Sequence, residues 1–405
     1  MRILMLTPIL PYPLHQGGAI RNFGILRGLS EAGHEVALLS FHDDSISVES
    51  TPLPRLCTEI RTVPPPHRTG AARLRDLILS RQPDLVRRLY SPAFEDCLRS
   101  LLNHVQFDLI QFEGLEMAAY LDLVRRQQPT ARLCYDAHNA EYRLQQAIFQ
   151  VDRREIRRWP AAVYSYIQSR RIARFEAEVC EKVDCVIAVS DEDAIALRNL
   201  SQDAPASVVP NGVSVDDYTN SREQLDLGQH VLVFTGKMDY RPNIDAMRWF
   251  TSDILPAIQE EIPDTRLYIV GQKPHARVEM LRDKPNVAIT GWVTDVRPYL
   301  HAAHVYVAPL RMGSGTRLKI LEAMAAGCAV VATSYAASGL TAEVRDVMVV
   351  ADDEKAMATA IVALLRAPQK REALGKAAQK YVKQRYDWTV LLPKLLAVYR
   401  EIGLG

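Results

Sequence analysis

Residues 305–327 read VYVAPLRMGSGTRLKILEAMAAG, and the fold prediction starts from them. The apolar run 305–308 is typical of a buried parallel strand, residues 309–316 of a glycine-rich loop, and residues 317–326 of a helix that ends at a glycine. In open parallel sheets, ligands bind in the loops that follow the strands. Glycines, cations and a carboxylate in one such loop suit a ligand with phosphate and hydroxyl groups. The candidate ligand-binding residues are Gly313, Ser314, Gly315, Thr316, Arg317, Lys319 and Glu322.

The same alternation of apolar strands and helical segments runs through the chain. It implies parallel sheets that are covered by helices on both faces. The predicted strands are Arg2–Thr7, Glu35–Phe41, Leu109–Phe112, Arg132–Asp136, Cys185–Val189, Val231–Thr235, Arg266–Val270, Val287–Thr290, Val305–Ala308 and Ala329–Ala332. The predicted helices include Ala19–Gly33, Ala93–His104, Met117–Gln127, Ile167–Lys182, Glu192–Leu200 and Ile244–Glu261.

The pattern restarts after VVPNGV at residues 208–213, so the chain divides near its middle. The segment 203–213 contains two prolines and an Asn-Gly pair, which is more typical of a linker or hinge than of a strand or helix. We therefore predict an α/β protein with two Rossmann-like, doubly wound domains, residues 1–208 and residues 209–385.

Composition narrows the class of protein. The 405 residues carry 49 Lys and Arg against 48 Asp and Glu, and 48% are hydrophobic, which is typical of a packed globular protein. The even charge balance disfavours a nucleic-acid partner. No run of 18 apolar residues occurs and the first residues lack a signal-peptide pattern, so we expect a cytoplasmic protein that spans no membrane. The six cysteines form no C-x-x-C pair, and no metal is expected.

Two further glycine-containing loops follow predicted strands. Gly17 and Gly18 open a helix, where bare amides at the positive end of the helix dipole can hold a phosphate. Lys237 and Arg241 come shortly after Gly236 and could neutralise a diphosphate. A simple turn at the first loop and a surface ion pair at the second are the alternatives.

A histidine lies in the loop DAHNAE, residues 136–141, after another predicted strand. His138 is a catalytic candidate because a strand end places it among acidic and amide neighbours. The chain has no Gly-x-Ser-x-Gly elbow and no His-Glu-x-x-His motif, which disfavours acyl transfer and zinc-dependent hydrolysis.

Taken together, these motifs resemble the GT-B glycosyltransferases, and within them the retaining family 4 (group 1), which takes sugars from nucleotide donors. The run from Gly236 to Phe250 further resembles bacterial transferases of exopolysaccharide and other surface-glycan pathways. The matching segments are the first strand with its Gly-Gly loop, residues 136–141, DCVIAVS at 184–190, PNGV at 210–213, Gly236, Gly271, Gly291 and LEAMAAG at 321–327.

The resemblance implies roles for individual residues. Gly18 would present its amide to the donor phosphates, and His138 would lie near the transferred sugar. Lys237 matches the family's first phosphate-binding cation, and Arg241 is the candidate for the second because the family's lysine falls at Pro242. Glu322 would accept hydrogen bonds from ribose hydroxyls.

The chain departs from the family at one position of the glycine loop. The family usually has a glutamate where this chain has Ser314. The amides of residues 313–316, together with Lys319, are expected to substitute for that carboxylate.

The resemblance also implies the reaction and the domain arrangement. We expect a glycosyltransferase that moves a sugar from a nucleotide-diphosphate sugar to a glycan or lipid-linked acceptor, with retention, without a cofactor and without a metal. The two domains would face each other across a cleft, the first on the acceptor side and the second binding the donor, with residues 386–405 forming a helix that packs back on the first domain.

A nucleotide-sugar 2-epimerase, a phosphorylase and a non-catalytic nucleotide-sugar-binding protein remain alternatives. A two-lobed solute-binding protein is disfavoured by the cation-rich loops.

The segment from Arg153 to Arg174 contains seven arginines and one acid, with Trp159, Tyr164 and Tyr166 between them. It could contact an anionic membrane surface, which would place the protein peripherally on the inner membrane face. A solvated helix face that packs through its tyrosines explains the same composition. Pro160 is expected to interrupt any single helix across this segment.

Overall fold

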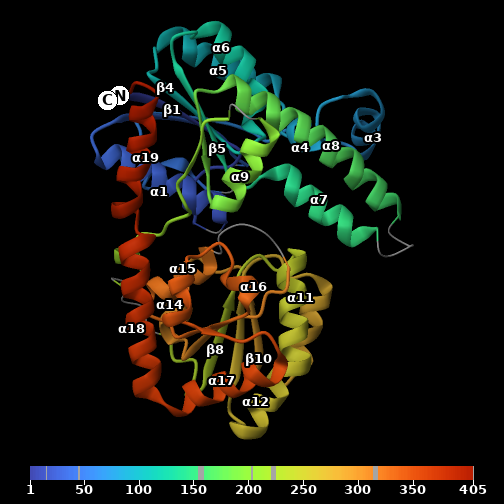
Figure 1. Cartoon of the computed structure of the whole chain (residues 1–405), viewed down its shortest axis with the longest axis vertical. Coiled ribbons are helices and arrows are strands. Elements are labelled where there is room, and N and C mark those ends of the chain that lie inside the picture. The colour runs from blue at the N-terminus through green and yellow to red at the C-terminus, as the bar shows by residue number, and fades with distance from the viewer. Residues whose placement is uncertain are drawn as a thin grey trace. The chain divides into compact units, whose positions relative to one another are not determined.

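The computed structural model describes residues 1–14, 16–43, 46–153, 159–201, 204–219, 225–312 and 318–404. The chain forms two compact units, which we call unit 1 (residues 1–210 and 392–405) and unit 2 (residues 211–391). Each unit is a parallel sheet flanked by helices (Figure 1), so the predicted α/β fold class with two doubly wound domains is confirmed. The sequence prediction placed the boundaries after residues 208 and 385, whereas the units divide after residues 210 and 391.

The sheet of unit 1 has seven strands in the order β3-β2-β1-β4-β5-β6-β7. Strand order reverses between β1 and β4, which lie at the centre, and such a switch point is where open α/β sheets bind ligands. The strands are β1 (Arg2–Thr7), β2 (Glu35–Phe41), β3 (Glu59–Val63), β4 (Leu109–Glu113), β5 (Arg132–Ala137), β6 (Cys185–Ala188) and β7 (Ala206–Val208). The main helices are α1 (Gly17–Glu31), α3 (Gly70–Leu79), α5 (Pro92–His104), α6 (Leu121–Gln127), α7 (Glu141–Asp152), α8 (Trp159–Lys182) and α9 (Asp191–Leu200).

The sequence prediction missed both edge strands of this sheet. Strand β3 is mostly half-buried and β7 has three residues, so neither produces the long apolar run of a central strand. Strand β7 also corrects the interpretation of residues 203–213 as a linker, because residues 206–208 pair with β6.

Two helix starts in unit 1 differ from the prediction. Helix α1 begins at Gly17, so Gly17 and Gly18 form its first turn and are not part of a preceding loop. Helix α8 begins at Trp159, which places Pro160 at its second position. Helix α7 ends at Asp152, so neither α7 nor α8 spans all of residues 153–174, as predicted, and Pro160 lies in the first turn of α8, where a proline removes no intrahelical hydrogen bond.

The sheet of unit 2 has six strands in the order β10-β9-β8-β11-β12-β13. The strands are β8 (Val231–Thr235), β9 (Arg266–Val270), β10 (Val287–Gly291), β11 (Val305–Ala308), β12 (Val330–Ala332) and β13 (Val349–Val350), the last of which was not predicted. The main helices are α10 (Val215–Thr219), α11 (Arg241–Trp249), α12 (Leu255–Glu261), α14 (Arg297–Ala302), α15 (Leu318–Ala325), α17 (Glu354–Arg366) and α18 (Pro368–Arg385). The order reverses between β8 and β11, whose following segments carry the predicted donor-binding residues.

The helix predicted at Ile244–Glu261 is not continuous. Helices α11 and α12 are separated by a π-helical turn at Phe250–Ile254. Pro256 lies in the first turn of α12 and has no N–H to donate, which explains why the α-helical hydrogen-bond pattern changes just before it.

The last helix, α19 (Trp388–Glu401), begins in unit 2 and continues in unit 1 from Leu392 onward. The part of α19 in unit 1 packs through one face, on which the side chains of Leu395 and Tyr399 are fully buried. In the ranges the structure describes, no helix is both long and apolar enough to cross a bilayer.

Candidate active site

In unit 2, the turn after β8 lies against a lysine from the start of α15. A Cβ atom added to Gly236 would lie 2.7 Å from Lys319 Nζ and 2.8 Å from Asn243 Nδ2. Lys319 Nζ donates to Asn243 Oδ1 at 2.8 Å and lies 4.2 Å from the ring centroid of Phe234. The structure thus brings together Gly236 and Lys319, which are 83 positions apart, as the sequence prediction requires.

Asn243 is a residue of this site that the sequence analysis did not single out. Its Nδ2 donates to the Lys237 carbonyl oxygen at 2.8 Å while its Oδ1 accepts from Lys319. It therefore connects the turn after β8 with the start of α15. Its place one residue after Pro242, in the first turn of α11, is the signal that could have identified it.

Gly271, after β9, packs against the same turn. Its φ of +153° is one that L side chains rarely adopt, and an added Cβ would lie 1.7 Å from the carbonyl oxygen of Gly236. Backbone atoms cannot move aside as a flexible side chain can, so only glycine fits here.

Gly271→Ala is therefore expected to lower the free energy of unfolding of unit 2 by about 2 to 3 kcal/mol, from overpacking and backbone strain together. Gly291→Ala is the matched control, because Gly291 also has a positive φ of +72° but nothing within 4 Å of an added Cβ. The free energy of unfolding of unit 2 is measured for both variants by chemical denaturation, with hydrogen exchange of β8 and β9 as the readout. Equal losses in the two would contradict the close backbone approach.

Glu322 is buried on α15, with 8% of its surface exposed. It accepts a hydrogen bond from the Tyr218 hydroxyl at 2.8 Å. Burial raises the pKa of Glu322 to about 7, although the Tyr218 hydrogen bond opposes the shift. A carboxylate held ready to accept hydroxyl donors fits the ribose-binding role that the resemblance implies.

The two predicted phosphate-binding cations differ in their surroundings. Lys237 is 40% exposed and lies 3.4 Å from an Asp239 carboxylate oxygen. Arg241 is exposed and forms the first residue of α11, not part of the loop. The predicted residues Gly313, Ser314, Gly315, Thr316 and Arg317 lie outside the described part of the chain.

In unit 1, the predicted residues Gly18 and His138 lie together. A Cβ on Gly18 would lie 3.5 Å from Nδ1 and Cε1 of His138, so the imidazole packs over the first turn of α1. Gly17, at the start of that turn, is exposed. The N-terminus of α1 and the loop after β5 therefore meet at the switch point between β1 and β4.

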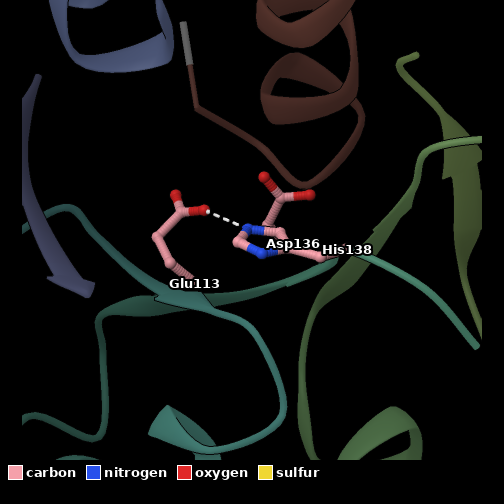
Figure 2. A group of neighbouring side chains, drawn as sticks. All are labelled: Glu113, Asp136 and His138. Atoms are coloured by element: carbon pink, nitrogen blue, oxygen red, sulfur yellow. Dashed lines mark hydrogen bonds and ion pairs between the residues drawn. The ribbon is translucent and has the colours of Figure 1, made fainter. Parts of the chain in front are cut away.

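His138 has a buried partner that the sequence analysis missed. Its Nε2 lies 3.2 Å from Glu113 Oε2 (Figure 2), and Glu113 is fully buried at the end of β4. Burial and the neighbouring Asp136 charge raise the pKa of Glu113 to about 7. Burial lowers the pKa of His138, but the hydrogen bond to Glu113 and the Asp136 charge outweigh it and leave that pKa raised. Glu113 ends the apolar run LIQFE, and this position was the sequence signal that could have identified it as a buried partner of His138.

Glu113 and Asp136 are register partners on neighbouring strands, so two carboxylates meet in the core. Arg21 of α1 compensates them: its Nε and Nη2 each donate to one oxygen of Asp136 at 2.8 Å. Its Nη1 donates to the carbonyl oxygens of Val209 at 3.0 Å and Pro210 at 3.2 Å. Arg21 therefore joins α1, β5 and the end of the first segment of unit 1.

Glu113, Asp136 and His138 offer ligand atoms within 4.8 Å of one another, close enough to be tested as a metal site. Both Asp136 oxygens are bound by Arg21, whose buried guanidinium already supplies a positive charge beside the two carboxylates. A divalent ion would have to displace this cation, so the residues do not fit a metal.

Solved structures with two such α/β units define the class of fold. Sucrose-phosphate synthase from Thermosynechococcus elongatus matches with a TM-score of 0.71 and 18% identity over 99% of each chain. Anabaena HepE, solved in complex with UDP and glucose, matches with a TM-score of 0.64 and 14% identity over 99% of this chain and 100% of that one. The fold is that of the GT-B glycosyltransferases.

Family models identify the chain more closely. Residues 16–217 match the model "Glycosyltransferase Family 4" and residues 229–367 match "Glycosyl transferases group 1". The chain therefore belongs to the family 4, group 1 glycosyltransferases, as the sequence motifs predicted.

Two curated relatives differ in how much of the chain they match. A phosphatidyl-myo-inositol mannosyltransferase of Mycobacterium leprae is 33% identical over 55% of this chain and 60% of its own length. The chain is thus matched over about three fifths of that relative. An uncharacterized 44.6 kDa protein in the cps region of Klebsiella pneumoniae is 21% identical over 95% of this chain and 96% of its own length.

Proposed function

We propose that this protein is a glycosyltransferase that moves a sugar from a nucleotide-diphosphate sugar to a glycan or lipid-linked acceptor, with retention of anomeric configuration. The observation that carries the proposal is the arrangement in unit 2, where Gly236, Lys319 and Glu322 combine a glycine turn without a side chain, a cation and a buried carboxylate. These are the groups that a diphosphate and a ribose require.

The reaction breaks a glycosidic bond while a nucleoside diphosphate leaves, so cations aimed at the growing phosphate charge contribute most. We assign this role to Lys237, Arg241 and Lys319. In the proposed same-face reaction the leaving phosphate accepts the acceptor's proton, and His138 contacts the transferred sugar. No metal or cofactor takes part in the proposed reaction, and at the Glu113–Asp136–His138 cluster the Arg21 cation already pairs with Asp136.

A donor panel with product detection tests this function. Nucleotide sugars with different bases and sugars are incubated with the full chain, with and without candidate acceptors, and the anomeric configuration of the product is read by NMR. Transfer with retention, unchanged by a chelator, is the expected result. Product from the donor alone would indicate an epimerase, a phosphate-dependent product a phosphorylase, and binding without turnover a non-catalytic protein.

Glu322→Gln is expected to weaken UDP binding about 3- to 10-fold, because an amide accepts hydroxyl donors less strongly than a carboxylate. The pKa of Glu322 near 7 adds a pH signature. The carboxylate is protonated below that value and ionised above it, so wild-type affinity rises as pH increases through about 7, relative to the variant. Calorimetry of UDP measures this, with Glu260→Gln, an exposed change on α12, as the control. Matching affinities and pH profiles in the wild type and Glu322→Gln would remove Glu322 from the nucleotide site.

We further propose that the acceptor is lipid-linked and that unit 1 contacts the inner face of the membrane. Helices α7 and α8 pack side by side and project from the sheet (Figure 1). Their exposed apolar residues include Ile148 at 38%, Trp159 at 60% and Tyr166 at 45%. Arg170 lies over the Tyr166 ring at 5.6 Å, so cations and aromatic rings share this surface. Interfacial anchors of this kind bind anionic bilayers.

Co-sedimentation with vesicles tests the membrane proposal. The protein is expected to pellet with anionic phosphatidylglycerol vesicles at low salt and to remain in the supernatant with neutral phosphatidylcholine. Changing Arg153, Arg154, Arg157 and Arg158 to Ser is expected to reduce binding at least tenfold, since each basic residue near an anionic surface contributes about 1 kcal/mol. Met280→Ser, which changes an apolar residue 62% exposed in unit 2, is the control. Unchanged binding by the arginine variant would make the segment a solvated helix face.

A further inference from the structure

A chain of buried hydrogen bonds leads from the C-terminal helix to His138. The Tyr399 hydroxyl on α19 donates to Oε1 of Gln111 on β4. Gln111 Nε2 donates to Glu113 Oε1 at 2.6 Å, and the other oxygen of Glu113 faces His138 Nε2 at 3.2 Å. The side chains of Tyr399, Gln111 and Glu113 are fully buried.

The direction of these bonds follows from the groups themselves. An ionised Glu113 can only accept, so Gln111 must turn its NH₂ toward Glu113 and its carbonyl toward Tyr399. Gln111 and Glu113 are two residues apart on β4 and share one face of the strand. Both carboxylate oxygens then accept, one from Gln111 and one from His138. This arrangement holds the proton of His138 on Nε2 and turns Nδ1 toward Gly18.

A fourth side chain contributes to the same carboxylate. With its amide nitrogen turned toward the surrounding acceptors, Asn22 of α1 lies 2.9 Å from Glu113 Oε2, 3.1 Å from the Gly18 carbonyl oxygen and 3.2 Å from His138 Nε2. An amide has two N–H donors, so with the proton of His138 on Nε2 both go to the Glu113 and Gly18 oxygens. This orientation is assigned from the hydrogen-bond network. Helix α1 therefore fixes Glu113 from the side on which Gly18 lies.

We infer that Tyr399 and Gln111 are positioning residues that act through Glu113 to set the tautomer and charge of His138. The inference rests on the proposed function only in giving His138 a task at the transferred sugar. The C-terminal helix thereby serves the site as well as the stability of unit 1.

The charged groups around Glu113 and His138 explain why the distant Tyr399 hydroxyl affects the charge of His138. Arg21 of α1 and Asp136 of β5 act on both Glu113 and His138, and Glu141 of α7 acts on His138. Tyr399 and Cys134 lie within electrostatic range of the same two carboxylates, and Cys185 acts on Tyr399 and Cys134. In such a closely balanced cluster, a weaker hydrogen bond from Gln111 to the Glu113 carboxylate changes whether Glu113 or His138 holds the proton.

The test is ¹⁵N NMR of the histidine side chains in the full chain, with His138 assigned from a His138→Asn spectrum. In the wild type we expect the Nε2–H tautomer. Tyr399→Phe removes one oxygen and is expected to lower the pKa of His138 by about 0.5 to 1, because Gln111 then holds the ionised Glu113 less firmly. Gln111→Met breaks the next link and is expected to have at least the same effect.

Tyr120→Phe is the matched control, because Tyr120 is also buried in unit 1 but its hydroxyl bonds to the backbone of Leu89 and Ser91. It should leave the His138 titration unchanged. An unchanged pKa and tautomer in Tyr399→Phe would overturn the inference, and so would an equal shift in the control. Should Gln111→Met fail to fold, Tyr399→Phe still decides the question.

Activity provides a second readout that separates this inference from the proposed function. In an active enzyme, Tyr399→Phe is expected to lower kcat about 3- to 10-fold with KM for the donor within twofold, and to move the pH-rate profile in the direction of the His138 pKa. If no donor reacts with the wild type while the NMR shift occurs, the proposed function fails and the network stands. If the wild type is active but Tyr399→Phe shows no NMR shift of His138, the hydrogen-bond network is refuted and the proposed function stands.

Discussion

Replacing Arg21 by Met is expected to lower the free energy of unfolding of unit 1 by about 3 to 5 kcal/mol, the range for removing one partner of a buried ion pair. The side chains of Arg21 and Asp136 are 1% and 0% exposed, so no water replaces the lost donors. The change would leave Asp136 unpaired beside its register partner Glu113. It would also leave two carbonyl oxygens, of Val209 and Pro210, without this donor.

Hydrogen exchange of β1 and β5 peptides measures this loss directly, with β8 and β9 of unit 2 as the internal standard. The double variant Arg21→Met/Asp136→Asn is expected to be more stable than Arg21→Met alone, because it removes the uncompensated charge. An exposed surface change, Arg400→Met, controls for the loss of a cation. A loss below about 1 kcal/mol in Arg21→Met, the size of an exposed pair, would show that the pair is not buried in solution.

Replacing Lys237 or Arg241 by Ala is expected to cost about 2 to 4 kcal/mol of transition-state stabilisation, the scale for losing one preorganised donor. At that scale kcat/KM falls about 30- to 1000-fold. The physical reason is that the negative charge on the leaving diphosphate grows as the bond breaks, so a cation aimed at it acts mainly in the transition state.

Arg248→Ala provides the matched control for Arg241, because both are exposed arginines of α11. The kinetic comparison uses the best substrate of the donor panel and separates kcat from KM. Activity within twofold of the wild type in both Lys237→Ala and Arg241→Ala would exclude these residues from the proposed phosphate clamp.

Central elements were predictable because their burial shows in local composition. Strands β1, β2, β8, β9 and β11 have the predicted bounds, since a strand covered on both faces is a continuous apolar run. The edge strands β3, β7 and β13 were missed, since a short or half-exposed strand depends on its neighbour for its hydrogen bonds more than on its own pattern.

Part of the candidate site was also predictable. Gly18 with His138, and Gly236 with Lys319, were expected at strand ends and lie in contact. Glu113 was overlooked although it ends an apolar strand, where a charged residue always requires a partner. Asn243 was overlooked because its bond to Lys319, 76 positions away, forms only when α11 and α15 meet, although its place after Pro242 in the first turn of α11 was visible.

The amino-acid sequence by itself determined the two parallel sheets, the family and the strand ends at which ligands are expected, because periodicity and glycine placement are local properties. Only the tertiary structure decided which groups share a proton or a charge. Tyr399 reaches Gln111 across 288 positions, and Arg21 reaches Asp136 across 115. Such pairs form because packing of α19 and α1 on the sheet removes water, so each buried polar group must find its partners within the protein, which no local pattern encodes.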